Sequence, residues 1–321
     1  MSNVEATPAE LVCGSTAGHH PVEVLTPRDV PLGGPRAMSV RRTLPQRERT
    51  MIGAWCFADH YGPDDVSETG GMDVAPHPHT GLQTASWLFT GEIEHRDSLG
   101  VHALVRPGEL NLMTGGSGIC HSEVSTPTTT TLHGVQLWIA LPDADRDAPR
   151  AFQHHVPSPI PLEGAVVRVF LGTLCGDTSP VPTHTPLLGA ELVLDKDARL
   201  ALDVDPTFEH GVLVDQGSAT LNGTPLKRGE LGYAPTGPTK LHLHNPGDDP
   251  ARLVLLGGTP FGEEIVMWWN FVGRTHEEIV RFRDEWQAES DRFGRVEGYP
   301  GNRLPAPPLP TGRLRPRGNP H

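Results

Sequence analysis

HPHTGLQTASWLFTGEIEHRDSLG, residues 77–100, is the stretch of this 321-residue chain that decides its fold. Its segment Leu82–Thr90 is short and apolar, as buried strands are. Similar segments recur on both sides of it: Met51–His60, Val101–Val105, Leu110–Met113 and Leu132–Leu141. Turn clusters separate them: Ser67–Gly71, Arg106–Gly108 and Gly115–Gly118. We therefore expect a β-rich domain around the quoted stretch.

A second β-rich region follows further along the chain. Its expected strands are Val166–Leu171, Glu191–Leu194, Gly211–Val214, Ala219–Leu221 and Arg252–Leu256. Asn222-Gly223 predicts a tight hairpin turn between two of the strands in this region. The chain holds 36 glycines and 33 prolines, which favours many short strands over a few long helices.

One helix is expected near the C-terminus. Thr275-x-x-Glu278 has the form of a capping box, and Ile279, Phe282 and Trp286 follow at helical spacing. His276-Glu277 has no second histidine at the spacing of a zinc-protease helix. We interpret the segment as a surface helix with an apolar stripe on a barrel.

These patterns predict six consecutive parts of the chain. They are an N-terminal arm without a core at 1–35, an N-terminal metal-binding domain at 36–145, a proline-containing linker at 146–165, a C-terminal β domain without metal at 166–260, a helical segment at 261–298, and a Pro/Arg-rich tail at 299–321 that is either extended or disordered.

The net charge of −13 disfavours direct binding of nucleic acid, because phosphate backbones would be repelled. The N-terminal residues lack the pattern of a secretory signal, and no apolar run reaches the length of a membrane span. The four cysteines have no paired spacing, so neither a disulfide framework nor a zinc ribbon is expected. Scattered thiols without an export signal predict a cytoplasmic protein.

Two short motifs predict a metal site. His77-Pro78-His79 and His121-Ser122-Glu123 each place two side chains on one face of a strand. If the two strands lie near each other in a barrel, three imidazoles and one carboxylate converge. This set suits Fe, Mn, Co, Ni, Cu or Zn, and leaves two positions open on a six-coordinate ion.

Other residues offer weaker signals. His95, Asp97 and His133 are candidates for tuning the site from behind the ligands. His242-x-His244 has the same spacing as the first motif, with His210 upstream, but lacks a convincing second pair. Trp87, Phe89 and Trp138 are candidates for either core packing or an aromatic-binding pocket. Cys120 is expected on the opposite face of its strand as a small buried residue.

The quoted stretch, together with RPGELNLMTGGSGICHSE (106–123) and LHGVQLWIALP (132–142), closely resembles the pirin family of bicupin proteins. This resemblance implies an all-β fold of two tandem cupin (jelly-roll) β-barrels packed face to face, with a short C-terminal helix. It implies metal in the N-terminal barrel alone, usually iron as Fe(2+). The residues of this chain at the positions of the family's metal ligands are His77, His79, His121 and Glu123. Many cupins have a glutamate ligand where this chain has Gln83, so Gln83 is expected beside the ligands.

The resemblance also implies a function. Several pirin-like proteins are similar to quercetin 2,3-dioxygenases, which open a flavonol ring with dioxygen, so a small aromatic substrate is expected. Glu123 is then the candidate base. The alternative is an iron-dependent redox-sensing regulator that binds a transcription factor or an enzyme as its protein partner. A monomer is the family-like expectation.

Overall fold

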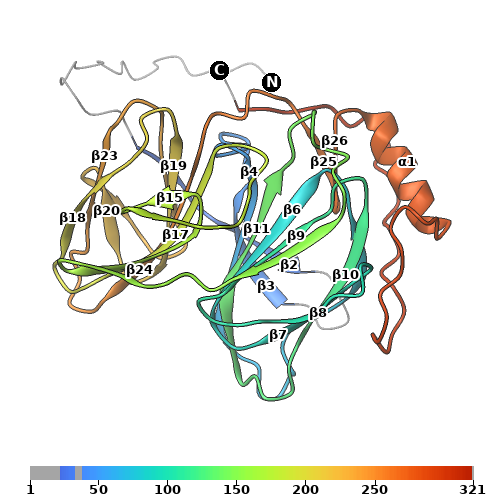
Figure 1. Cartoon of the computed structure of the whole chain (residues 1–321), viewed down its shortest axis with the longest axis horizontal. Helices are drawn as coiled ribbons and strands as arrows, with labels where there is room; N and C mark the ends of the chain where they lie inside the picture. The colour runs from blue at the N-terminus through green and yellow to red at the C-terminus, as the bar shows by residue number, and fades with distance from the viewer. Residues whose placement is uncertain (1–21, 33–37, 320–321) are drawn as a thin grey trace, which may run out of the picture.

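Two β-barrels lie side by side in the computed structural model, which describes residues 22–32 and 38–319 (Figure 1). The N-terminal barrel is built from a seven-stranded and a four-stranded sheet. The larger sheet runs in the order β12 (Ala151–His155), β9 (Leu110–Thr114), β6 (Leu82–Thr90), β11 (Thr131–Ala140), β4 (Trp55–Asp65), β3 (Met38–Leu44) and β2 (Arg28–Leu32). The smaller runs in the order β5 (Asp73–His79), β10 (Ile119–Ser125), β7 (Ile93–Asp97) and β8 (His102–Val105).

The C-terminal barrel repeats this plan. Its larger sheet runs in the order β1 (Glu23–Leu25), β22 (Leu231–Ala234), β19 (Glu209–Gln216), β24 (Ala251–Gly258), β17 (Leu187–Leu194), β14 (Ala165–Leu171) and β13 (Ile160–Leu162). The smaller runs in the order β18 (Arg199–Asp203), β23 (Lys240–His244), β20 (Ala219–Leu221) and β21 (Thr224–Leu226). A two-stranded ribbon is formed by β15 (Thr173–Leu174) and β16 (Asp177–Thr178). Asn222 and Gly223 both have positive φ at the β20–β21 turn, so the predicted hairpin is confirmed.

The two seven-stranded sheets pack face to face, as the resemblance implied. Strand β19 shows why, because its alternate side chains are apolar on both faces. Val212 and Val214 lie in the core of the C-terminal barrel, whereas Leu213 lies in the cluster between the barrels. Trp55 of the N-terminal barrel donates its indole N–H across this interface to the carbonyls of Leu188 (3.1 Å) and Gly257 (3.2 Å).

The N-terminal arm differs from the expectation that residues 1–35 hold no core; residues 1–21 and 33–37 of that segment lie outside the described residues. Strand β1 pairs with β22 of the C-terminal barrel, and β2 pairs with β3 of the N-terminal barrel. Leu25 is 2% exposed and belongs to the core cluster between the barrels. Its burial there makes this strand part of the interface.

The segment predicted as a linker, 146–165, also contains two strands. Strand β12 pairs with β9 at the edge of the N-terminal sheet, and β13 pairs with β14 at the edge of the C-terminal sheet. Prolines are tolerated in such edge strands because one side of the strand needs no ladder hydrogen bond. Of the prolines in this segment, Pro161 lies in β13, whereas Pro149, Pro157 and Pro159 lie outside the strands.

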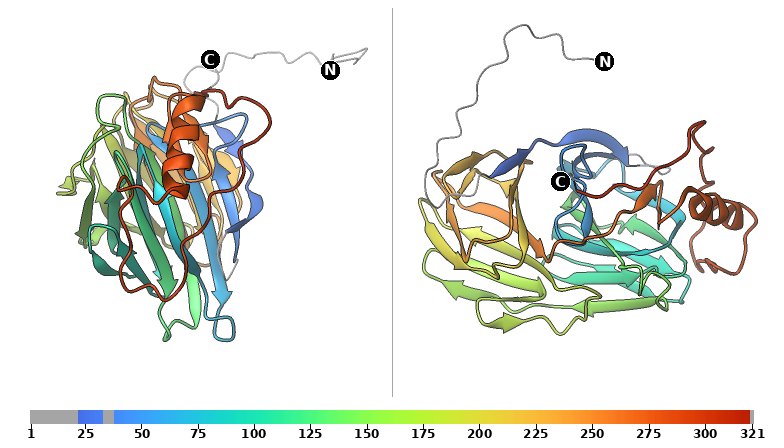
Figure 2. Two further views of the ribbon diagram at one scale, coloured as in Figure 1. Left: turned by 90° about the vertical axis from the view of Figure 1, so that its right-hand side faces the viewer. Right: turned by 90° about the horizontal axis from the view of Figure 1, so that it is seen from above.

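The chain returns to the N-terminal barrel after β24. Strands β25 (Val266–Trp268) and β26 (Phe271–Gly273) form a hairpin, and α1 (His276–Gln287) follows with the predicted capping box. Figure 2 shows α1 on the outer side of this barrel, away from the C-terminal one, and the end of the tail running back toward the interface between the barrels. The tail is extended, and Leu304 N donates to Pro76 O of edge strand β5 at 2.8 Å. In the part of the chain that the structure describes, no helix has the length and apolar character needed to cross a membrane.

Candidate metal centre

The two predicted motifs face each other on neighbouring antiparallel strands. His77 of β5 is directly opposite His121 of β10, and His79 is opposite Ile119. The register shifts between His121 and Glu123, so that Glu123 is opposite Val74. The β5–β10 pairing thus brings together residues that are more than 40 positions apart in the sequence.

The three imidazoles form a tight group. One ring nitrogen from each of His77, His79 and His121 lies within 4.8 Å of the others. The Nε2 atoms of His79 and His121 are 3.0 Å apart. Because a metal–nitrogen bond is about 2.1 Å long, two nitrogens at this spacing can bind the same ion. All three side chains are buried.

Hydrogen bonds behind the rings orient two of these imidazoles. His77 Nδ1 lies 3.0 Å from the carbonyl oxygen of Ala75, and His79 Nδ1 lies 3.2 Å from that of Asn270. A carbonyl can only accept, so both Nδ1 atoms carry the proton. The Nε2 lone pairs are therefore left for a metal ion.

A side-chain relay orients the third imidazole. His121 Nδ1 lies 3.3 Å from His95 Nδ1, and His95 Nε2 lies 3.2 Å from Asp97 Oδ2. The Asp97 carboxylate accepts from His95 Nε2, which leaves His95 Nδ1 as the acceptor for His121 Nδ1–H. This carboxylate–histidine–histidine chain resembles the carboxylate–histidine pairs that stand behind metal ligands in other proteins.

Burial keeps these imidazoles neutral. Desolvation lowers the pKa of His77 to about 4, and it lowers the pKa values of His79 and His121 well below 6.5. Neutral imidazole is the form that binds a metal ion. The donor set therefore fits a transition-metal ion without a prior loss of protons at neutral pH.

Glu123 lines the same cavity but lies outside the tight group of three. The residue is 7% exposed, and desolvation raises the pKa of its carboxyl group. Ser86 Oγ lies 3.5 Å from Glu123 Oε1 and donates more closely, at 2.9 Å, to Gln136 Oε1. The carboxylate is thus weakly bound by the protein and is available as a ligand or as a proton acceptor.

A cavity of about 360 Å³ opens beside the histidines. Phe57 and Trp138 are stacked in its wall with ring centroids 4.1 Å apart, and Trp138 meets His79 edge to face at 5.2 Å. Arg42 holds Asp59 through two hydrogen bonds of 2.7 Å and lies over the Phe57 ring at 4.2 Å. The lining thus combines aromatic rings with polar and charged side chains, which can orient a small molecule.

Comparison with known proteins identifies the family. Residues 37–139 match the pirin family, and residues 189–294 match the pirin C-terminal cupin domain. A Pseudomonas aeruginosa protein that carries a provisional quercetin 2,3-dioxygenase name is 45% identical over 293 residues, which are 91% of each chain. The chain belongs to the pirin family.

Two further relatives agree with this assignment. A pirin-like protein of Caulobacter vibrioides is 33% identical to this pirin-family chain over 258 residues, 78% of this chain and 88% of its relative. The crystal structure of a quercetin 2,3-dioxygenase from Acinetobacter baumannii is 39% identical and superposes with a TM-score of 0.86. The superposition covers 92% of this chain and 97% of the A. baumannii chain.

Two further residues were expected around the ligands of this pirin. Gln83 does not line the cavity, and its amide donates to Thr114 Oγ1 at 2.9 Å. His133 points away to the barrel interface, where it bonds to Asp215. His133 is on strand β11 of the larger sheet, whereas the three grouped histidines are on β5 and β10 of the smaller sheet. Its closeness in sequence to the pirin motifs therefore does not bring it to the metal centre.

The aromatic candidates separate into two groups. Trp138 lines the cavity, whereas Trp87 is buried between the barrels and donates to Glu191 Oε2 at 2.7 Å. Phe89 packs against the same interface cluster. Cys120 is 1% exposed and belongs to the apolar cluster under α1, as its place on the opposite face of β10 predicted.

Sequence reasoning missed the contribution of the C-terminal segment. Trp269, Asn270 and Leu304 line the cavity, although they lie about 150 or more positions after His121. Their only sequence signal was the adjacent pair Trp268-Trp269, because nothing local indicates that this hairpin returns to the first barrel.

A second buried cluster joins the two barrels. His60 Nε2 lies 2.7 Å from Asp215 Oδ1, and His133 Nε2 bonds to the same oxygen. Arg41 Nε donates to His60 Nδ1 at 3.3 Å, so His60 Nε2 carries the proton and donates to Asp215. We interpret this cluster as a hydrogen-bonded bridge between the barrels, since the His60 lone pair is already used.

In the second barrel, the described histidines form no comparable group. His210 is fully buried with both ring nitrogens unpartnered, and burial lowers its pKa to about 4. His244 Nε2 pairs with Asp197 at 3.0 Å, and His242 is exposed.

Proposed function

We propose that this pirin is a metal-dependent dioxygenase that opens the ring of quercetin-like flavonols, with iron(II) as its metal. The observation that carries the proposal is the group of three buried, neutral imidazoles at an aromatic-walled cavity. The 39% identical A. baumannii protein, named as a quercetin 2,3-dioxygenase, supports the substrate class. We propose His77, His79, His121 and Glu123 as the ligands.

A bound metal would act as a Lewis acid that lowers the pKa of a hydroxyl on the substrate, and it would leave coordination positions free for substrate and dioxygen. The chain's own residues would do the rest. The stacked pair of Phe57 and Trp138 would form an apolar wall beside the planar rings of a flavonol, with the faces of Phe57 already covered by Trp138 and Arg42. Arg42, held by Asp59 in the cavity wall, would offset the negative charge of the ionised substrate.

Glu123 is the proposed base for the flavonol hydroxyl. Its burial raises its pKa, which favours proton uptake by the carboxylate compared with an exposed glutamate. Only one weak hydrogen bond, from Ser86, holds Oε1, so the carboxylate can receive a proton without breaking a strong contact.

The test is oxygen uptake with quercetin by protein purified without oxygen, with the metal content measured in parallel. We expect near-stoichiometric iron and quercetin-dependent uptake in wild type, and neither in a His77→Ala/His121→Ala variant that keeps its circular-dichroism spectrum. A His242→Ala variant is the matched control, because His242 is an exposed histidine of the other barrel.

Three results would contradict parts of the proposal. Another metal at full occupancy with turnover would replace iron. Bound metal without oxygen uptake would exclude the flavonol dioxygenase and favour another substrate or a redox-sensing role. Folded wild type that binds no transition metal would exclude the metal centre itself.

A further inference from the structure

The turn between β25 and β26 holds a tryptophan in an unfavourable backbone conformation. The last pair of this hairpin is Trp268 with Phe271, so Trp269 and Asn270 form a two-residue loop. Trp269 has a φ of 54°. Both preferred two-residue hairpin turns need positive φ at this first position, where glycine, asparagine or aspartate is usual. A bulky residue there is a clear outlier.

This turn lies at the metal cavity. Trp269 and Asn270 both line it, and the Asn270 carbonyl accepts from His79 Nδ1 at 3.2 Å. Trp269 remains half buried, whereas its neighbour Phe271 is fully buried under α1 and meets the Trp269 ring edge to face at 5.4 Å. The indole is therefore at the cavity rim and is only partly covered by the core.

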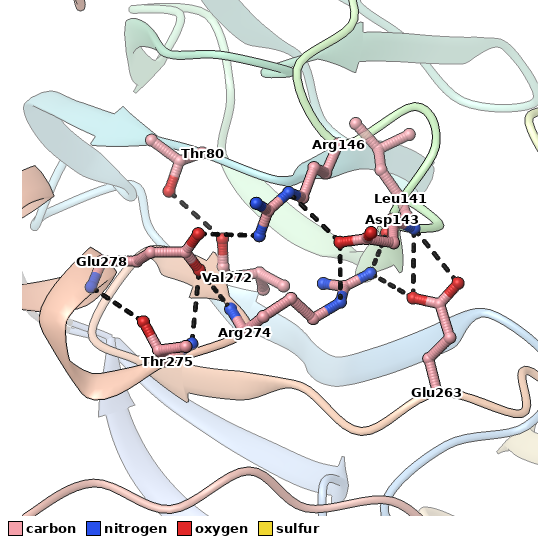
Figure 3. A network of polar contacts seen from close by, with 9 residues as sticks. All are labelled: Thr80, Leu141, Asp143, Arg146, Glu263, Val272, Arg274, Thr275 and Glu278. Carbon is pink, nitrogen blue, oxygen red and sulfur yellow. Dashed lines mark hydrogen bonds and ion pairs between the residues drawn. The ribbon is translucent and has the colours of Figure 1, made fainter.

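The hairpin is fixed firmly in this place. Val272 N donates to Thr80 O at 3.0 Å, directly after the ligand His79. Arg274 donates to the Leu141 carbonyl at 2.8 Å and to Glu263 at 2.5 Å. Figure 3 shows this network, in which Arg146 and Glu278 form a further ion pair at 2.8 Å. These anchors directly follow the turn and hold β26 against the N-terminal barrel.

Trp268 provides an internal comparison. It is also half buried, and both tryptophans pack against the apolar cluster under α1, but Trp268 has an ordinary φ and does not line the cavity. Of these adjacent tryptophans, the one that faces the cavity is the one with the unfavourable backbone. Residues held in sparsely populated conformations by their surroundings concentrate at functional sites.

We propose that Trp269 is a specificity-determining residue, whose indole contacts a planar aromatic ligand in the cavity. This inference rests on the proposed function for the ligand class. Phe57, Tyr61 and Trp138 also line the cavity, so Trp269 adds a further aromatic side chain to it. An aromatic lining favours flat polycyclic ligands over aliphatic ones of equal size.

The test separates the indole from the backbone. Trp269→Ala removes the ring and keeps a Cβ at positive φ, whereas Trp269→Gly removes both. We expect the glycine variant to melt about 2–4 °C above the alanine variant. Both variants should bind quercetin about tenfold more weakly than wild type in oxygen-free calorimetry, and Trp269→Phe should restore most of the affinity.

Trp268→Ala is the matched control, and we expect its quercetin affinity to stay within about twofold of wild type. Metal content is measured for every variant, so that a loss of affinity is compared at equal loading. Equal affinity of Trp269→Ala and wild type would overturn the proposal, as would an alanine variant that melts at or above the glycine variant. Wild type that binds no quercetin would also overturn it.

Binding without oxygen does not depend on turnover. If the protein is not a dioxygenase, the oxygen-uptake assay shows it, and the effect of Trp269 on quercetin affinity can still be measured.

Discussion

The Nδ1 atom of His121 lies 3.3 Å from the Nδ1 atom of His95, and His95 in turn contacts Asp97 at 3.2 Å. All three side chains are buried, so water cannot replace these hydrogen bonds. The relay fixes which nitrogen of His121 faces the other two histidines. It also links the candidate ligand to a negative charge that raises its basicity.

We expect His95→Phe to weaken metal affinity about 10–100-fold, because the variant fills the same space without orienting His121. Competition titration with a chromogenic chelator measures this affinity. His102→Ala is the control, since His102 is an exposed histidine on the neighbouring strand β8. A His95→Phe variant with wild-type metal affinity would exclude a role for the relay.

Removal of the metal should leave the fold intact but lower its stability. At a free metal concentration about 100 times Kd, binding adds about 2.7 kcal/mol to the free energy of unfolding. We expect this difference between metal-loaded and chelator-treated protein in denaturant titrations. The His77→Ala/His121→Ala variant should show no such difference, and the His242→Ala variant should show all of it. Metal-dependent stabilisation of the double variant would place the ion elsewhere.

The bridge between the barrels should make stability depend on acid. Burial by itself would raise the pKa of Asp215, but hydrogen bonds from His133 and His60 outweigh it and hold that pKa at about 2, below the ordinary 3.8. The native state therefore binds fewer protons than the unfolded state in this range. The contribution, about 2 kcal/mol, is complete above about pH 4 and is lost as the pH falls toward 2.

Asp215→Asn tests this bridge directly. The variant should lower the free energy of unfolding by about 3 kcal/mol at pH 7, because Arg252 and two buried imidazoles lose their charged partner. Its stability should fall less steeply than that of wild type between pH 4 and 2. Asp248→Asn, at an exposed ion pair with Lys196, is the control and should change little. Identical pH profiles for wild type and Asp215→Asn would contradict the bridge.

Helix α1 depends on its capping box. Thr275 accepts a hydrogen bond from Glu278 N at 3.2 Å, and Glu278 Oε2 accepts from Thr275 N at 3.3 Å. Thr275→Ala should lower the free energy of unfolding by about 1 kcal/mol, and Thr275→Ser should restore it. Thermal melting of the three proteins compares them. Equal stability of the alanine variant would mean that packing of Phe282 and Trp286 alone holds the helix.

Local patterns were enough for much of the fold. The strand at Leu82–Thr90, the Asn222-Gly223 hairpin and the helix begun by Thr275 depend on residues close together in sequence, and each is present. Pro149, Pro157 and Pro159 of the predicted linker do lie outside strands, but β12 and β13 in the same segment form by pairing with β9 and β14, which the prolines do not indicate. Burial of β1 depends on the distant strand β22, so no local pattern predicted it.

The residue pattern alone pointed to the three histidines that meet at the centre. Two residues at i and i+2 of a strand share a face, so the His77–His79 and His121–Glu123 motifs predicted convergence before any strand pairing was known, although Glu123 lies outside the tight group of three. The tertiary structure decided what surrounds them. Only the return of the C-terminal segment brings Trp269 and the Asn270 carbonyl to the cavity, and only the packing of the two barrels takes His133 to Asp215. Strand periodicity is a local property of the backbone, whereas these contacts join residues whose separation in sequence carries no information about their distance in space.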